Sequence, residues 1–125
     1  MINGVQWLAV AVAGALGAMS RYGLGVLVGP RAFPWTTLAV NVTGSFVLAF
    51  VLAGPVAERL SSTATIALTV GFLGAYTTFS TFGYETVTLA RDDRLPAAAA
   101  YVIASLVVGL AAAAAGYALG RALVD

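Results

Sequence analysis

The residues best suited to chemistry in this chain form a hydroxyl-rich, aromatic stretch at residues 74–82, Gly-Ala-Tyr-Thr-Thr-Phe-Ser-Thr-Phe. The stretch lies in the middle of an otherwise hydrophobic segment, residues 63–90. Unpaired polar groups are costly in hydrocarbon, so polar or irregular backbone at that depth persists only where it packs in protein or lines an aqueous or ion-filled cavity. The stretch therefore favours a permeation or binding site inside a membrane.

Three side chains offer groups that could attract a small anion. Phe79 and Phe82 are three residues apart and share one helix face, and their ring edges carry the positive part of the aromatic quadrupole. Asn41 lies in the preceding hydrophobic segment, and its amide has two N–H donors. Each also has a plainer use, which is apolar packing for the rings and an interhelical hydrogen bond for the amide. Taken singly, each residue favours the plainer use.

The segment from Gly74 to Thr78 has a second possible use as a cation site. Glycine followed by consecutive β-branched threonines favours a helix break, and a break frees backbone carbonyls that coordinate cations. The alternative is a continuous helix whose threonine hydroxyls bond to carbonyls one turn earlier. Further along the chain, Tyr101, Ser105 and Gly109 share one helix face, where the first two supply hydroxyl donors and Gly109 supplies none.

Two charged residues lie near the ends of hydrophobic segments. Arg21 is expected to snorkel towards the interface, and its other use is to supply positive potential at the entrance for an anion. Glu85 lies two helical turns beyond Thr78 and is expected near a vestibule. It could be a proton-coupled site, an ion-pair partner of Arg21, or a solvated side chain.

The composition places the chain in a bilayer. Hydrophobic residues make up 61% of the sequence and charged residues only 9%, too few to cover the surface of a soluble domain. A net charge of +1 gives no reason to expect a nucleic-acid partner. The chain has neither Cys nor His, which excludes disulfides, thiol chemistry and an imidazole-ligated metal.

Turn residues and charges divide the chain into four apolar spans, residues 5–28, 36–53, 63–90 and 96–123. Each is close to or longer than the roughly 20 residues that a helix needs to cross the hydrocarbon core. No basic segment precedes the first span, so we expect a retained helix rather than a cleaved signal peptide. The sequence predicts an all-α membrane protein with one four-helix transmembrane domain, residues 1–125, whose third helix is broken near its middle.

The short loops define an orientation only weakly. Arg59 and Arg121 fall on one side, whereas Arg31, Arg91 and Arg94 fall on the other, joined by Arg21 if the end of the first span counts. Such a small bias suits a chain that inserts both ways and forms an antiparallel homodimer, although another determinant could fix one orientation. Four helices enclose little space, so a dimer with pores inside it or at its interface is expected.

Small residues recur at four-residue intervals in two of the spans. Ala112, Gly116 and Gly120 do so in the last span, and Ala13 and Gly17 in the first. Such spacing lets helix backbones approach closely in lipid. The pattern suits either a dimer interface or packing within one protomer.

Three segments of the chain resemble the signature segments of the Fluc (CrcB) fluoride channels. They are residues 17–22 (Gly-Ala-Met-Ser-Arg-Tyr), residues 37–46 (Thr-Leu-Ala-Val-Asn-Val-Thr-Gly-Ser-Phe), and residues 71–82 together with Glu85. The resemblance extends over nearly the whole chain, in motif order and in length. It implies a dual-topology antiparallel homodimer with two pores, a structural sodium ion at its centre, and passive export of fluoride from the cytoplasm through the cell membrane. No enzyme activity is implied.

The resemblance also implies roles for individual residues. The fluoride pathway would comprise Asn41, Thr78, Phe79, Ser80, Thr81, Phe82, Tyr101 and Ser105. The backbone carbonyls of Gly74 and Thr77 would hold the sodium ion, and Arg21 and Glu85 would line a vestibule. The chain departs from the family pattern at Gly109, where a hydroxyl is usual, and at Ala75, where glycine is frequent.

Two other functions compete with a fluoride channel. A small multidrug antiporter also has four helices and dual topology, but it needs a carboxylate embedded in the membrane, and only Glu85 is available. The second rival is a structural membrane subunit whose polar stretch binds a partner helix. Fluoride flux through protein-containing liposomes separates all three functions.

Overall fold

The structure, a computed structural model, describes residues 2–125 and contains helices but no strands in that range. The elements are α1 (Gly4–Val28), α2 (Trp35–Ala53), α3 (Pro55–Arg59), α4 (Ser62–Ile66), η1 (Ala67–Leu73), α5 (Gly74–Tyr76), α6 (Phe79–Arg91) and α7 (Leu95–Ala122). Element η1 is a π-helical segment, a feature that the sequence did not predict. The all-α class predicted from the sequence is confirmed.

Four helical segments are long and apolar enough to cross a membrane, namely Gly4–Val28, Trp35–Ala53, Ser62–Arg91 and Leu95–Ala122. The four predicted spans are confirmed, and each bound differs from the prediction by one residue at most. The third segment combines α4, η1, α5 and α6. It therefore contains the hydroxyl-rich stretch in its interior.

Local sequence signals explain where these helices begin and end. The Asn3 side chain caps α1 by accepting a hydrogen bond from the backbone N–H of Val5 at 3.1 Å. The same helix ends at Gly29, whose φ of 70° lies in the left-handed region that favours glycine. Pro55 occupies the first turn of α3, and Ser61 caps α4 through the N–H of Ala64.

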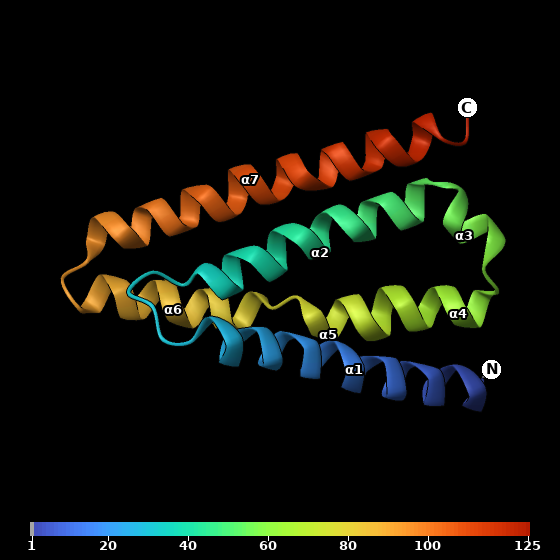
Figure 1. The fold of residues 1–125 in the computed structure, drawn as a ribbon, viewed down its shortest axis with the longest axis horizontal. Coiled ribbons are helices and arrows are strands. Elements are labelled where there is room, and N and C mark those ends of the chain that lie inside the picture. Colours follow the sequence, from blue (N-terminus) through green and yellow to red (C-terminus); the bar gives the residue numbers. More distant parts are fainter. Residues whose placement is uncertain (1) are drawn as a thin grey trace.

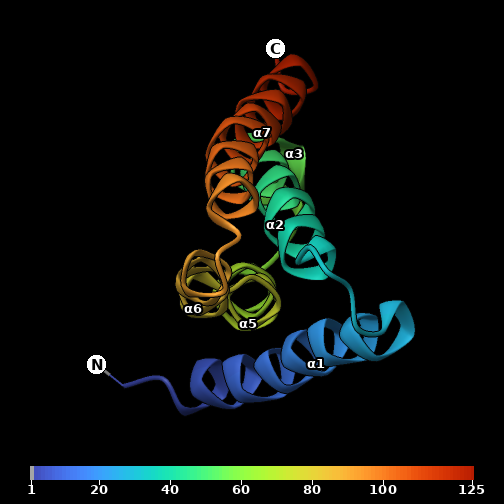
Figure 2. The same cartoon turned by 90° about the vertical axis from the view of Figure 1, so that its left-hand side faces the viewer.

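The long helices form a bundle in which α1 and α7 lie on opposite sides (Figure 2). Helix α2 packs along α7, whereas α1 packs against η1 and α5. Both ends of the chain lie at one end of the bundle, and the loop between α1 and α2 lies near the α6–α7 turn at the other (Figure 1). The guanidinium of Arg94 in that turn donates a hydrogen bond to the carbonyl of Ala32 in the loop.

Small residues allow the close contacts between helices of the same chain. A Cβ atom added to Gly17 would lie 2.1 Å from the carbonyl oxygen of Phe72, and one added to Gly116 would lie 2.2 Å from that of Phe46. Neither position accepts a side chain without separating the two backbones. At Gly17 and Gly116, packing within the protomer therefore accounts for the small residue.

Candidate functional site

The third span is interrupted at Thr77 and Thr78. Helix α5 ends at Tyr76, and the next two residues are extended, with φ and ψ of −86° and 158° at Thr77 and −153° and 117° at Thr78. Helix α6 begins at Phe79, and the Thr78 hydroxyl caps it by accepting a hydrogen bond from the N–H of Thr81 at 3.2 Å. Backbone polar groups are thereby released from helical hydrogen bonding inside a membrane span.

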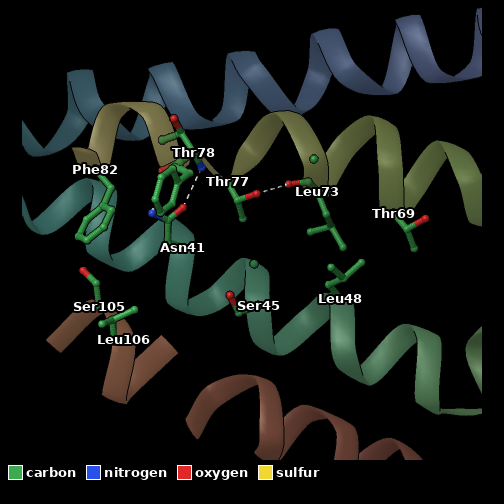
Figure 3. Close-up of a pocket in the computed structure, with 13 residues that line it drawn as sticks. Asn41, Ser45, Leu48, Thr69, Leu73, Thr77, Thr78, Phe82, Ser105 and Leu106 are labelled. Atoms are coloured by element: carbon green, nitrogen blue, oxygen red, sulfur yellow. Dashed lines mark hydrogen bonds between the residues drawn. The ribbon is translucent and has the colours of Figure 1, made fainter. Parts of the chain in front are cut away.

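Asn41 of α2 satisfies the backbone of Thr78 with two hydrogen bonds (Figure 3). Its Nδ2 donates to the carbonyl of Thr78 at 3.0 Å, and its Oδ1 accepts from the N–H of Thr78 at 2.8 Å. The interhelical use of Asn41 considered from the sequence is thus realised. An amide nitrogen has two hydrogens, and no second hydrogen bond from Nδ2 is found within residues 2–125. One N–H therefore stays available to a ligand.

The carbonyl oxygens of Gly74 and Thr77 accept no hydrogen bond within the described part of the chain. In a continuous helix they would accept from the N–H groups of Thr78 and Thr81. Those two donors instead bond to the Asn41 side chain and to the Thr78 hydroxyl. The interruption thus leaves two hard oxygen donors of the kind that coordinate small cations in discontinuous membrane helices.

A cavity of about 310 Å³ opens beside the interruption (Figure 3). It brings together seven of the predicted site residues, namely Asn41, Gly74, Thr77, Thr78, Phe79, Phe82 and Ser105. These come from α2, the third span and α7, so the fold gathers them from three separate regions of the sequence. None of the cavity-lining residues carries a charge. Ser80, Thr81 and Tyr101 lie outside this lining.

The aromatic rings lie at one end of the cavity. The centroids of Phe79 and Phe82 are 5.7 Å apart with an angle of 56° between the rings. Phe82 also makes an edge contact with Tyr101, at 5.1 Å between centroids. Phe79 is 82% exposed, so its ring points away from the rest of the protomer. The edge of the cavity at Phe79 is accordingly open in a single chain.

Ser105 is the clearest sign of a ligand in the cavity. Its hydroxyl oxygen is buried and has no hydrogen-bond partner among the described residues. Leaving a buried hydroxyl unpaired costs about 1–3 kcal/mol, so such groups are rare unless a water or ligand completes them. The hydroxyl lies near Phe82, on the α7 side of the cavity (Figure 3). It is free to donate to an anion.

Three hydroxyls cluster at the start of α6. The Thr78 hydroxyl lies 3.1 Å from that of Thr81 and 3.3 Å from that of Ser80. These contacts complete a polar patch where the extended residues meet the helix. Gly109, the third residue on the same predicted face of α7 as Tyr101 and Ser105, does not line the cavity. Ser105 is therefore the one of these three residues that contributes to the lining.

Arg21 and Glu85 do not form an ion pair, since the only salt bridge among the described residues joins Arg121 and Asp125. The Nε of Arg21 instead donates to the carbonyl of Ala75 at 3.1 Å. Arg21 thus completes one of the carbonyls that the interruption releases from helical hydrogen bonding. Arg21 also lines a second cavity of about 450 Å³ together with Thr37 and Thr78.

Glu85 bonds with two hydroxyls. Its Oε1 accepts from Thr37 at 2.6 Å and from Tyr101 at 3.4 Å. Sequence reasoning assigned no role to Thr37, which is 8% exposed and lies four residues before Asn41 on α2. That shared helix face was the only signal that could have pointed to Thr37.

The fold and the cavity define a small four-span membrane protein with an uncharged polar cavity at the interruption of its third span. The chain belongs to the CrcB family, because the family model described as CrcB-like protein, Camphor Resistance (CrcB), matches residues 8–117. The family named from the sequence segments is therefore confirmed.

Three similar proteins carry the name fluoride-specific ion channel FluC. The protein from Thermus thermophilus is 45% identical over 122 residues, which is 95% of this chain and 98% of the relative. Those from Geobacter sulfurreducens and Agrobacterium fabrum are 44% and 47% identical, over 93% and 91% of this chain and 97% and 94% of their own lengths. The similarity thus covers all four spans.

Proposed function

We propose that this chain is a fluoride-selective ion channel that lets fluoride leave the cytoplasm passively, and that it catalyses no reaction. The observation that carries the proposal is the uncharged cavity, in which the Asn41 amide and the unpartnered Ser105 hydroxyl offer donors beside two phenylalanine rings. The names of the similar proteins agree with it. The chain is a multi-pass protein of the plasma membrane, with four apolar spans and bacterial relatives.

This chemistry suits fluoride because the ion is small and strongly hydrated. A selective pore must replace its water with several donors held close together. The cavity contains no carboxylate, which would repel an anion, and Glu85 lies outside its lining. A proton-coupled antiporter needs an embedded carboxylate at its binding site, so the cavity favours a channel over that alternative. The names of the similar proteins favour a channel over a purely structural subunit.

We also propose that two chains pair antiparallel. Phe79 is 82% exposed at the edge of the cavity, so a second copy would supply the missing side of the pathway. The weak arginine bias of the loops suits insertion in both orientations.

A label at the C-terminus tests this topology. We expect a tag placed after Asp125 to be accessible from both sides of the membrane in about equal amounts, since neither orientation is strongly favoured. Accessibility is measured with an impermeant reagent on intact cells and on inverted vesicles. Tagging a chain with extra arginines in the residues 29–34 loop provides the control, because this change should drive most copies into one orientation. A wild-type tag that reacts from one side only would contradict dual topology.

We further propose that a sodium ion binds at the interruption of the third span. The carbonyls of Gly74 and Thr77 would hold it, and the lack of any hydrogen bond to either oxygen within residues 2–125 supports this fit. A bound cation would coordinate these otherwise unpaired oxygens and could join two copies of the interruption. The described residues contain no cluster of three or more acidic side chains that would serve a cation instead.

Fluoride release from proteoliposomes tests the proposed function. Vesicles loaded with fluoride should release it rapidly once a potassium ionophore relieves the charge build-up, and vesicles loaded with chloride should retain it. Phe82→Ile should reduce fluoride release about fivefold, because it removes a ring edge worth about 1 kcal/mol while keeping apolar bulk. An ion-selective electrode records the release.

The matched control is Phe50→Ile, the same exchange in an aromatic pair with Phe46 that lies outside the cavity lining. Its fluoride release should equal that of the wild type. Equal release of fluoride and chloride by the wild type would rule out the proposed function. Full activity of Phe82→Ile would show that the Phe82 ring is not part of the fluoride pathway.

A further inference from the structure

The Tyr101 ring is the third in a row of aromatic rings that begins with Phe79 and Phe82 at the cavity. The Tyr101 ring contacts Phe82 on one side, and on the other it meets Phe33 edge-on, with centroids 5.4 Å apart and an angle of 78°. Tyr101 is fully buried, with 0% exposure. Its ring is therefore held between Phe82, which lines the cavity, and Phe33, which does not.

Phe33 belongs to the loop between α1 and α2, and that loop is fixed to the rest of the bundle. The Arg94 guanidinium donates to the carbonyl of Ala32, next to Phe33. The N–H of Trp35 donates to the carbonyl of Phe33 at 2.8 Å, and the rings of these two residues lie 4.7 Å apart. The loop thus presents one ring to Tyr101 in a defined position.

Phe33 also borders a cavity of about 410 Å³ that it shares with Thr37 and Glu85. Loss of this ring would enlarge that cavity and remove the edge contact that Tyr101 makes on the side away from Phe82. The Tyr101 hydroxyl already lies at a long 3.4 Å from Glu85, close to the limit of a hydrogen bond. A small rotation of the ring would break that bond and move the edge that supports Phe82.

We propose that Phe33 is a positioning residue for the ion pathway, because it holds the Tyr101 ring against Phe82 and the Tyr101 hydroxyl on Glu85. This inference rests on the proposed channel function. Phe33 does not line the cavity of Phe82, and its ring contact with Tyr101 is the route by which it acts on Phe82. A loop residue outside the cavity thereby contributes to the rate at which the anion passes.

The test compares fluoride release by Phe33 variants in proteoliposomes. Phe33→Ala should reduce release about fivefold, the effect of one lost aromatic contact of about 1 kcal/mol. Phe33→Tyr should restore wild-type release, because it keeps the ring. Phe50→Ala is the matched control, since it makes the same exchange in a ring that stacks on Phe46 outside the cavity lining, and its release should equal that of the wild type.

A double-mutant cycle with Tyr101→Phe separates positioning from general stability. This variant keeps the ring but lacks the hydrogen bond to Glu85, so Phe33→Ala should cost less in that background than in the wild type. Size-exclusion chromatography checks assembly, and Phe33→Leu replaces Phe33→Ala if the alanine variant does not assemble. The inference is overturned if Phe33→Ala matches Phe50→Ala, or if its cost is the same in both backgrounds. A wild type that releases no fluoride would instead overturn the channel function itself.

Discussion

Asn41→Asp should abolish fluoride release from proteoliposomes. The substitution replaces the amide nitrogen, which donates to the Thr78 carbonyl at 3.0 Å, with an oxygen that cannot donate. It also places a negative charge in the lining of an uncharged cavity. Two like charges about 4 Å apart repel by about 4 kcal/mol in protein surroundings, which corresponds to roughly a thousandfold loss of anion occupancy.

Two further variants show which of these changes causes the loss. Asn41→Ala removes both hydrogen bonds to Thr78 without adding charge, so it should retain more fluoride release than Asn41→Asp. Gln6→Glu makes the same amide-to-carboxylate exchange on α1, outside the main cavity, and should release fluoride like the wild type. Wild-type release by Asn41→Asp would show that the anion does not pass this residue.

The four spans were predictable because their signals are local. The apolar runs are long enough for helices that cross a bilayer. Gly29, Pro55 and Asn3 mark helix ends through their own backbone or side-chain chemistry. The composition of residues 74–82 likewise pointed to the cavity, since polar groups inside an apolar span need partners. The π-helical η1 had no comparable signal, because its residues are ordinary for an apolar helix.

The contacts that shape the site depend on packing between distant residues and were not predictable. Asn41 and Thr78 are 37 positions apart, and no single segment shows that one completes the backbone of the other. The same holds for Arg21 at the end of α5. The partners of Glu85 were equally hidden, because Thr37 and Tyr101 lie 48 and 16 positions away from it in the sequence. Side-chain type suggested which groups were important, whereas the fold determined their partners.

Gly74→Leu should prevent sodium-dependent dimer formation. In the protomer, a Cβ atom at Gly74 meets only the carbonyl of Thr69, at an ordinary 3.8 Å, so the backbone of a single chain does not require glycine there. The harm would therefore arise where a second copy and the cation approach the Gly74 carbonyl. Dimer content in detergent is measured by size-exclusion chromatography across a series of sodium concentrations, with a large inert cation keeping the ionic strength constant.

Two matched variants make this result specific. Gly83→Leu is the same exchange on α6, where an added Cβ atom meets nothing within 4 Å, and it should leave the sodium dependence unchanged. Thr77→Ser keeps both the backbone carbonyl and a hydroxyl that can donate to Leu73, as that of Thr77 does at 2.9 Å, so its effect should be mild. If the wild-type dimer is equally stable without sodium and Gly74→Leu assembles normally, the carbonyls of Gly74 and Thr77 hold no structural cation, although the fluoride pathway through Asn41 would still stand.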